Sequence, residues 1–263
     1  MSKQQDNKKN IVMCFSGHDP SGGAGLQADI EAIAANHAHA CTIVTALTEQ
    51  DSSQVQQVVP IDLSLFQASA QTLLSDIPVN VFKTGLLADA SIARAITKII
   101  TQYPTIPLII DPVLASGAGT RLADAELIAV IKEQLLPLAT IVTPNLPEAQ
   151  TLSGEQAPEA CAEKLLATGC QHVLLTGTHA TTDNVINTLY SNNTCIEFEV
   201  ARLDNDYHGS GCTLAASLAA NLANDHDINT SVSMALDYTW QSLKQGQAIG
   251  KGQRHPNRQF SHD

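Results

Sequence analysis

The amino-acid sequence predicts an α/β fold, with a mostly parallel central sheet, helices on both of its faces and an antiparallel edge. Short runs rich in β-branched residues alternate with longer segments of helical periodicity, which is the pattern of β-α-β units. Near the C-terminal end, two strand-like runs flank the polar residues 191–193, which predicts a hairpin. The 263 residues are 44% hydrophobic, which is enough apolar material for one sizeable core.

The first half of the chain supplies five β-rich runs and the helices between them. Residues 11–16 form a β-branched run, and the next segment has apolar residues at helical spacing. In chain order, the predicted elements are strand 11–16, helix 23–36, strands 42–47 and 54–59, helix 63–74, strand 81–84, helix 91–101 and strand 107–111.

The second half repeats the alternation and then changes it. The two runs of the hairpin follow one another without a helix, which places an antiparallel pair at the edge, and a last pair of helices closes the fold. The predicted elements are helix 124–135, strand 140–143, helix 160–167, strands 172–176, 184–190 and 195–200, and helices 212–224 and 230–248.

The chain is predicted to form a single domain. No Gly/Ser/Pro-rich linker divides residues 11–249, and no internal repeat is present. The polar residues 1–10 predict a flexible N-terminus, and the polar residues 250–263 predict a loose C-terminal tail.

Charge and composition exclude several classes of partner. The 14 Lys and Arg against 26 Asp and Glu give a net charge of −12, which would repel nucleic acid and anionic membrane surfaces. Apolar runs fall far short of the about 18 residues that suggest a membrane span. The polar first residues predict a cytoplasmic protein, and the six cysteines lack Cys-x-x-Cys spacing, which argues against a zinc site and favours reduced thiols.

Polar residues and glycines gather after the predicted parallel strands, where functional loops of open sheets lie. The segment 208–214 leads into an Ala-rich helix, so that Gly209, Ser210 and Gly211 place backbone N–H groups at a helix N-terminus, which suits a phosphate. Cys212 lies in the first turn, where the helix dipole favours a thiolate that could act as base or nucleophile. The alternative interpretation is a glycine-containing helix start with an inert cysteine.

Two acidic positions are candidates for holding a cation. Asn145 and Glu148 lie three residues apart after a strand, where Glu148 either favours a helix start or helps to hold Mg²⁺ through water. Asp111 ends a very apolar run and either caps the strand or serves the same ion or phosphate. Single histidines such as His208 lack metal-ligand spacing and are interpreted as local hydrogen-bonding groups.

Several common motifs are absent from the sequence. There is no P-loop, no Gly-x-Gly-x-x-Gly after the first strand and no Gly-x-Ser-x-Gly elbow. A P-loop nucleotide site, a dinucleotide-dependent oxidoreductase and an α/β-hydrolase therefore lose their main support.

Taken together, the loops resemble the ribokinase-like family, and within it the bacterial hydroxymethylpyrimidine/phosphomethylpyrimidine kinases of thiamine synthesis. The resemblance spans roughly residues 11–249, and Cys212 stands where the sugar kinases of the superfamily usually have Asp. The matching segments, in the family's order, are 17–29 (GHDPSGGAGLQAD), 45–50, 83–87 (KTGLL), 111–113 (DPV), 143–149 (TPNLPEA) and 208–214 (HGSGCTL).

The resemblance implies a ribokinase-like three-layer sandwich and a kinase that uses ATP and Mg²⁺. The expected reaction is phosphorylation of 4-amino-5-hydroxymethyl-2-methylpyrimidine and then of its monophosphate, in a homodimer. The alternatives are a pyridoxal or pyridoxine kinase on the same fold and a non-catalytic pyrimidine-binding protein. Gln50 favours the pyrimidine, because an amide complements an aminopyrimidine edge.

The resemblance also implies the site residues. Cys212 would accept the hydroxyl proton, within an anion hole formed by Gly209, Ser210, Gly211 and Cys212. The substrate would contact Gly17, Asp29, Gln50, Leu86 and Val113. ATP would contact Asp111, Asn145, Thr176 and Gly211, and Mg²⁺ would be held by Glu148 and Asp111, partly through water.

Two positions depart from the family's pattern. Many relatives have Lys where Thr176 stands, and another Lys in the loop that reads here as residues 115–120. Arg121, Lys83 and the metal ion are the candidate substitutes for neutralising phosphate charge. The departure bears most on the second phosphorylation, whose acceptor is itself anionic.

Overall fold

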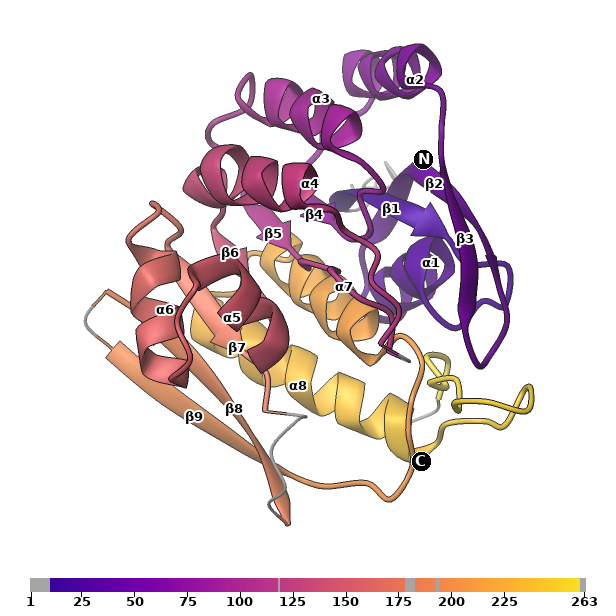
Figure 1. The fold of residues 1–263 in the computed structure, drawn as a ribbon, viewed down its shortest axis with the longest axis vertical. Helices are drawn as coiled ribbons and strands as arrows, with labels where there is room; N and C mark the ends of the chain where they lie inside the picture. Colours follow the sequence, from indigo (N-terminus) through magenta and orange to yellow (C-terminus); the bar gives the residue numbers. More distant parts are fainter. Residues whose placement is uncertain (1–9, 118, 178–182, 193, 261–263) are drawn as a thin grey trace, which may run out of the picture.

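The structure is a computed structural model that describes residues 10–117, 119–177, 183–192 and 194–260. A nine-stranded sheet has the order β3-β2-β1-β4-β5-β6-β7-β8-β9, which Figure 1 traces from β3 at the right to β9 at the lower left. The strands are β1 (Ile11–His18), β2 (His39–Gln50), β3 (Val55–Pro60), β4 (Val81–Thr84), β5 (Leu108–Ile110), β6 (Ile141–Val142), β7 (His172–Leu175), β8 (Asn184–Ser191) and β9 (Thr194–Ala201).

The predicted parallel sheet with an antiparallel edge is confirmed. The strands from β2 to β7 pair in parallel, and the hairpin of β8 and β9 continues the sheet antiparallel. The opposite edge is antiparallel as well, because β3 folds back on β2, with Leu47 opposite Val59. This second edge was not predicted, since a β-branched run alone does not reveal its direction.

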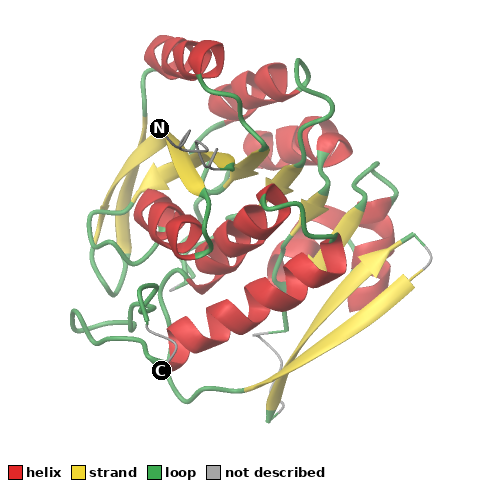
Figure 2. Cartoon of the chain, turned by 180° about the vertical axis from the view of Figure 1, so that it is seen from behind, coloured by secondary structure: helices red, strands yellow, loops and turns green. Residues whose placement is uncertain are grey.

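Helices cover both faces of the sheet, as the alternation of strand residues requires. In β1, Met13 and Phe15 pack on one face with α2 to α6, whereas Val12 and Cys14 pack on the other with α1, α7 and α8 (Figure 2). The helices are α1 (Gly25–Ala35), α2 (Leu63–Asp76), α3 (Ala90–Ile100), α4 (Ala125–Val130), α5 (Leu146–Ser153), α6 (Pro158–Leu166), α7 (Ser210–Ala223) and α8 (Ile228–Lys244).

Helix boundaries follow local signals. Asp89 and Asp124 accept hydrogen bonds from the first turns of α3 and α4, so each carboxylate caps a helix where the sequence predicts one. The predicted helix 124–135 divides into α4 and a single π-helical segment, Ile131–Leu135, which a periodicity of 3.6 cannot distinguish from a continuous helix. No helix among the described residues is long and apolar enough to cross a membrane.

The C-terminal segment 250–260 differs from the predicted loose tail. Arg254 forms a β-bridge with Tyr207, His255 forms one with Gln247, and Arg258 is only 2% exposed. Residues 250–252 and 259 are exposed, whereas His255, Pro256 and Arg258 are buried, so part of this polar segment packs against the rest of the protein. The predicted flexible N-terminus lies, apart from Asn10, outside the described residues, as do residues 261–263.

Candidate active site

The candidate site lies where the carboxyl ends of the central strands meet the N-terminus of α7. A Cβ built on Gly211 would lie only 3.7 Å from Oδ1 of Asp111, which directly follows β5. The Cys212 side chain hydrogen-bonds the same carboxyl group. The fold therefore brings the predicted anion hole and the predicted cation ligand together from positions about a hundred residues apart in sequence.

Tight backbone packing shapes the predicted anion hole. Gly209, the N-cap of α7, has a φ of 75°, and a Cβ there would lie 2.0 Å from the Gly23 carbonyl oxygen. Gly25, at the start of α1, has a φ of 59° and equally leaves no room for a Cβ beside the Gly17 carbonyl. The Gly25 N–H also hydrogen-bonds Cys212. Two helix N-termini, of α1 and α7, thus meet at this point, with their free N–H groups and positive dipole ends.

The surroundings of Cys212 oppose the thiolate that its place in α7 predicts. Desolvation by the surrounding protein, with the neighbouring Asp111 carboxyl, raises the pKa of the thiol to about 12, although Lys83 and the Gly25 N–H act in the opposite direction. At neutral pH the group is a thiol. Sequence reasoning weighed the helix dipole but could not see the burial and the acidic neighbour that outweigh it.

Lys83 and Asp29 form a buried ion pair beneath this site. Lys83 Nζ lies 2.7 Å from Asp29 Oδ1, both side chains are fully buried, and Nζ also donates to Ser16 Oγ at 3.4 Å. Burial alone would lower the pKa of Lys83, but Asp29, with Cys212 and Asp111, raises it well above its usual value. Lys83 is therefore protonated at neutral pH.

This pair changes the interpretation of two sequence predictions. The ammonium of Lys83, a candidate substitute for the missing phosphate-binding lysines, is enclosed and bonded to Asp29. Asp29 bonds Lys83 through Oδ1, and its second oxygen, Oδ2, is buried without a hydrogen bond, so its expected contact with the substrate hydroxyl stays a prediction. Arg121 is exposed, and its Nε donates to the Ala123 carbonyl at 2.7 Å. Residue 118 of the neighbouring loop lies outside the described residues.

Asp111 and Glu148 form a pair of crowded carboxyl groups. Burial, and then the Asp111 charge, raise the pKa of Glu148 to about 8, and burial also raises the pKa of Asp111. Glu148 accepts from the Asn145 N–H at 3.0 Å, while the Glu148 N–H donates to Asn145 Oδ1 at 2.9 Å in a capping box. Glu148 thus stabilises the start of α5, as one interpretation predicts, while its part in holding Mg²⁺ stays a prediction.

The carboxyl pair fits a hard cation that keeps most of its own water. Oδ2 of Asp111 is buried without a hydrogen bond, and a cation between two mutually repelling carboxyl groups would relieve both features. Within the described ranges there is no cluster of three or more acidic, His or Cys side chains that could hold a metal by themselves. Mg²⁺ suits such a sparse donor set, because it accepts few carboxylates and leaves positions for phosphate oxygens and water.

The remaining predicted residues occupy the same edge. Thr176 forms a β-bridge with Asn145, and its N–H donates to the Pro144 carbonyl at 2.9 Å. A Cβ on Gly17 would lie 2.9 Å from Leu86 Cδ2, so the Leu86 side chain lies against Gly17. The Val113 N–H donates to the Asp111 carbonyl at 2.9 Å, which places Val113 beside the acidic pair.

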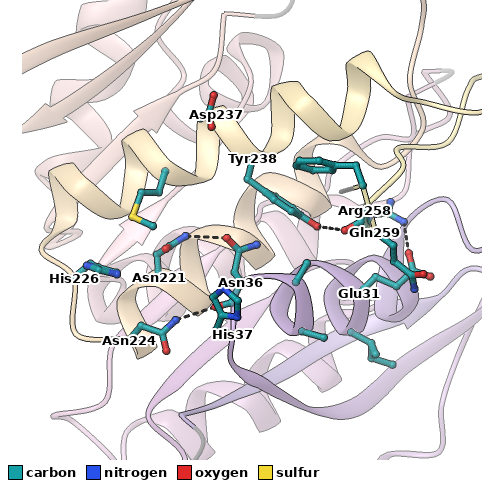
Figure 3. A pocket seen from close by; sticks show the side chains of 15 residues that line it. Glu31, Asn36, His37, Asn221, Asn224, His226, Asp237, Tyr238, Arg258 and Gln259 are labelled. Atoms are coloured by element: carbon teal, nitrogen blue, oxygen red, sulfur yellow. Dashed lines mark hydrogen bonds and ion pairs between the residues drawn. The ribbon is translucent and has the colours of Figure 1, made fainter. Parts of the chain in front are cut away.

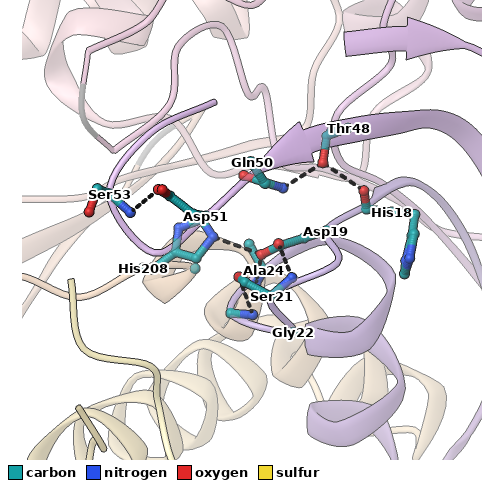
Figure 4. A network of polar contacts seen from close by, with 12 residues as sticks. His18, Asp19, Ser21, Gly22, Ala24, Thr48, Gln50, Asp51, Ser53 and His208 are labelled. Atoms are coloured by element: carbon teal, nitrogen blue, oxygen red, sulfur yellow. Dashed lines mark hydrogen bonds and ion pairs between the residues drawn. The ribbon is translucent and has the colours of Figure 1, made fainter. Parts of the chain in front are cut away.

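Gln50 is connected to the first-strand loop through one intermediate. Its Nε2 donates to Thr48 Oγ1 at 2.8 Å, and the Thr48 hydroxyl donates to the His18 carbonyl, also at 2.8 Å (Figure 4). The end of β2 is thereby fixed to the end of β1. The half-buried Gln50 amide retains its carbonyl oxygen for a ligand.

Asp19 and His208 connect the two glycine-rich loops, and sequence reasoning did not single out Asp19. His208 Nε2 lies 2.7 Å from Asp19 Oδ2, and Asp19 accepts from the N–H groups of Ser21 and Ala24, both at 2.8 Å (Figure 4). Although burial acts in the opposite direction, the hydrogen bonds from His208 and Ser21 lower the pKa of Asp19 to about 2. The signal in sequence was an Asp followed by Ser and glycines, which is typical of a turn that a carboxylate caps. The interpretation of His208 as a local hydrogen-bonding group is confirmed.

A hollow of about 630 Å³ lies away from this edge, between α1, α7, α8 and residues 258–260 (Figure 3). Its lining includes Glu31, Asn221, Tyr238 and Arg258 but none of the predicted site residues.

Comparisons with known proteins agree with the fold and with the predicted family. A thiamine biosynthesis bifunctional protein ThiED of Geobacter sulfurreducens is 32% identical over 250 residues, which are 93% of this chain and 51% of that protein, so the chain spans about half of this relative. A hydroxymethylpyrimidine/phosphomethylpyrimidine kinase of Synechococcus elongatus is 36% identical over 250 residues, which are 92% of this chain and 95% of that protein. An ADP complex of Bacillus subtilis pyridoxal kinase matches with a TM-score of 0.87 and 29% identity over 95% of this chain and 97% of that one.

The structural match confirms the predicted ribokinase-like fold, since the aligned parts cover nearly all of both chains. The sequence profile of the family described as phosphomethylpyrimidine kinase matches residues 19–257. This range contains every predicted site residue except Gly17, and it reaches into the C-terminal segment that packs against the site. The chain therefore belongs to the phosphomethylpyrimidine kinase family.

Proposed function

We propose that this protein transfers the γ-phosphoryl group of ATP to the hydroxymethyl group of 4-amino-5-hydroxymethyl-2-methylpyrimidine and then to the resulting monophosphate, as a step of thiamine synthesis. The observation that carries the proposal is the first turn of α7, which opens beside the Asp111 carboxylate in a chain of this family. Backbone N–H groups at a helix start suit the charge of a phosphoryl group in transfer.

In this proposal the anion hole consists of the N–H groups of Gly209, Ser210, Gly211 and Cys212. They are fixed before any ligand binds, because Gly209 packs directly on the Gly23 carbonyl. Preorganised donors of this kind contribute about 3 kcal/mol each to transition-state stabilisation in comparable sites. Gly17, Leu86 and Val113 would enclose the pyrimidine ring, and Gln50 would bond its amino edge. Positioning then accounts for most of the catalysis, as is usual for loose phosphoryl transfer.

Asp111, with Glu148 acting through water, would hold Mg²⁺, and Asn145 and Thr176 would face the nucleotide. When bound, Mg²⁺ supplies positive charge against the triphosphate, which matters in a chain with neither of the usual lysines. Glu148, whose pKa is about 8, would have to release its proton as the cation binds.

Cys212 would receive the proton of the substrate hydroxyl only after it has itself lost a proton. The raised pKa of the Cys212 thiol opposes this loss of a proton, whereas the positive charge of the enclosed Lys83 ammonium favours it. In its thiol form, Cys212 can donate a hydrogen bond to Asp111. Replacing Cys212 by alanine tests whether the thiol contributes to turnover.

A pyridoxal kinase is the second candidate, and the observation that favours it is the TM-score of 0.87 to such an enzyme. Pyridoxal has a ring of similar size with a hydroxymethyl group. Gln50 discriminates between the two, because only the aminopyrimidine presents a matching donor and acceptor edge to its amide.

We also infer a cytoplasmic homodimer. All six cysteines are free thiols, which suits a reducing compartment. Leu47 and Val59, opposite one another on β2 and β3, are 50% and 46% exposed, and Leu65 is 55% exposed. Large apolar side chains in such positions are typical of a surface that a second copy covers.

The testing experiment measures ADP release with MgATP and three acceptors in parallel: hydroxymethylpyrimidine, its monophosphate and pyridoxal. Product masses are then determined. We expect a diphosphate product from the pyrimidine. Monophosphate alone would restrict the function to the first step, turnover of pyridoxal alone would assign vitamin B6 salvage, and no turnover would favour the pyrimidine-binding alternative. Asp111→Asn serves as the inactive control for contaminating kinases, and the exposed Glu126→Gln as the active one.

A further inference from the structure

The C-terminal segment runs along both glycine-rich loops of the candidate site. The backbone of Arg254 is hydrogen-bonded to the residues that precede the predicted anion hole. Its N–H donates to the Asp206 carbonyl at 3.0 Å, and its carbonyl accepts from the His208 N–H at 2.9 Å. Four residues later, Arg258 turns inward, and its own carbonyl accepts from the Tyr238 hydroxyl at 2.8 Å (Figure 3). The segment is thus fixed at two points on either side of His255.

The Arg258 guanidinium is enclosed and has a hydrogen bond for each of its nitrogens. Its side chain is only 1% exposed. Nη1 donates to the Gly22 carbonyl at 3.2 Å and lies 3.2 Å from Glu31 Oε2 (Figure 3), Nη2 donates to the Gly23 carbonyl, and Nε donates to Thr213 Oγ1 at 2.9 Å. Glu31 provides the opposite charge that a buried cation needs. Because the arginine guanidinium is a planar fork with several donors, it can bind the Gly22 and Gly23 carbonyls and the Thr213 hydroxyl of α7 at the same time.

These bonds fix the first-strand loop relative to α7. The peptide group between Gly23 and Ala24 is held at both ends, because Arg258 binds its carbonyl and Asp19 accepts from its N–H at 2.8 Å. On the other side, the Thr213 hydroxyl that accepts from Arg258 donates to the Gly209 carbonyl at 2.8 Å. The same Gly23 carbonyl is the group on which Gly209 packs.

We propose that Arg258 is a positioning residue, which sets the spacing between the first-strand loop and the anion hole and thereby the aim of the N–H groups of α7. This inference rests on the proposed function for its effect on turnover. Arg258 does not itself reach the reacting atoms. The C-terminal segment would therefore contribute to catalysis indirectly, through the position of the two loops. A shift of about 1 Å in such a donor set can lower turnover about a hundredfold.

The test compares Arg258→Met, Arg258→Lys and the exposed control Arg94→Met, whose guanidinium pairs with Glu126 at the surface. We expect Arg258→Met to lower kcat about a hundredfold per folded molecule while the KM for the pyrimidine changes little. Arg258→Lys should fall between, because one ammonium can bind the glycine carbonyls but not Thr213 as well. A loss of kcat that only follows the folded fraction, or equal effects in all three variants, would overturn the inference.

Hydrogen exchange separates this inference from the proposed function. In Arg258→Met, we expect faster amide exchange in peptides covering residues 19–25 and 209–214, with unchanged exchange in the sheet core at β5. If the wild-type protein phosphorylates no pyrimidine, the proposed function fails, but this local exchange pattern still decides whether Arg258 fixes the loops. Faster exchange throughout the protein, or no change in exchange at residues 19–25 and 209–214, would contradict the positioning role.

Discussion

Among single residues, the enclosed ammonium of Lys83 has the widest influence on the candidate site. It neutralises Asp29 directly, and its charge lowers the pKa of Cys212 and of Asp111 against the burial that raises both. Three acidic groups therefore share one cation in a region of low dielectric constant, where each charge affects the others strongly. A neutral ligand changes this balance little, whereas a phosphate or Mg²⁺ must change it.

Replacing the thiol tests whether Cys212 serves as the proton acceptor. We expect Cys212→Ala to lose most of its turnover, at least about tenfold, because removal of a general base usually costs that much or more. The pyrimidine should still bind, since Gly17, Leu86 and Gln50 remain. Steady-state kinetics and calorimetric binding of the pyrimidine measure both, with the exposed Cys195→Ala as the control. Near wild-type turnover would show that the thiol is not needed as the base.

The carboxylate of Asp19 should make stability dependent on acid. Its pKa of about 2 lies below the ordinary 3.8, so it stabilises the fold at pH values above about 4, and this contribution is lost as the pH falls through about 2. Asp19→Asn keeps one acceptor oxygen but cannot accept from both Ser21 and Ala24. We expect a loss of about 2 kcal/mol at pH 7.

Urea unfolding of Asp19→Asn and wild type from pH 7 to pH 3 measures this difference, which should narrow below about pH 4. Asp51→Asn is the matched control, because Asp51 also accepts two backbone N–H groups, from Ser53 and Gln54, but does so in an exposed turn. A difference that stays constant with pH, or an equal loss in the control, would show that the Asp19 charge is not what stabilises the loop.

Individual residues also show how far sequence reasoning reaches. Asp111, Glu148 and the 209–212 segment were predicted from their places after strands or before a helix, and the fold does bring them together. The partners of Asp29 and Arg258 were not predictable. A buried ion pair or an enclosed guanidinium joins positions 54 and 235 residues apart, and no local pattern records such a pairing.

Among the elements, the start of α7 depends on a backbone that only glycine accommodates. Gly209→Ala would combine a positive φ with a Cβ that overlaps the Gly23 carbonyl, so we expect loss of both stability and kcat. Gly154→Ala is the matched control, because its φ is 82° but a Cβ there meets nothing within 4 Å. The control should lose only about 1 kcal/mol and keep its turnover. Thermal unfolding and steady-state kinetics compare the two variants. Similar kcat values for Gly209→Ala and Gly154→Ala would contradict the proposed role of the anion hole.

The elements themselves were largely predictable, for a physical reason. Most strands are buried on both faces and most helices are amphipathic, so the apolar period identifies them and most errors lie at their ends. The exceptions are α5, for which no helix range was predicted, and the π-helical segment that follows α4. The direction of a strand and the docking of a terminal segment could not be predicted in this way, as β3 and the C-terminal segment illustrate. The antiparallel course of β3 is set by its short turn with β2, and the docking of residues 250–260 is set by hydrogen bonds to distant loops.

In the molecule as a whole, the distribution of charge is unusual for a protein that handles triphosphate. The net charge is −12 and Lys83 is enclosed, and no lysine stands at Thr176 or in the loop 115–120, where the family resemblance leads us to expect one. In the proposed function, local attraction comes mainly from the helix N-termini and Mg²⁺, with the exposed Arg121 as a further candidate, while the long-range field of the protein opposes an anion. These two contributions respond differently to salt.

Ionic strength should therefore change the KM for MgATP in the direction opposite to that of a lysine-lined site. Salt raised from about 10 mM to about 150 mM shortens the Debye length from about 30 Å to about 8 Å, which screens the repulsion by the distant carboxylates more than the contacts inside the site. We expect the KM for MgATP to fall severalfold over this range, and the KM for the uncharged hydroxymethylpyrimidine to stay constant as the internal control. Steady-state kinetics in potassium chloride at fixed free Mg²⁺ measures both. A KM for MgATP that rises with salt would mean that surface cations such as Arg121 bind the triphosphate, and Arg121→Gln would then abolish that rise.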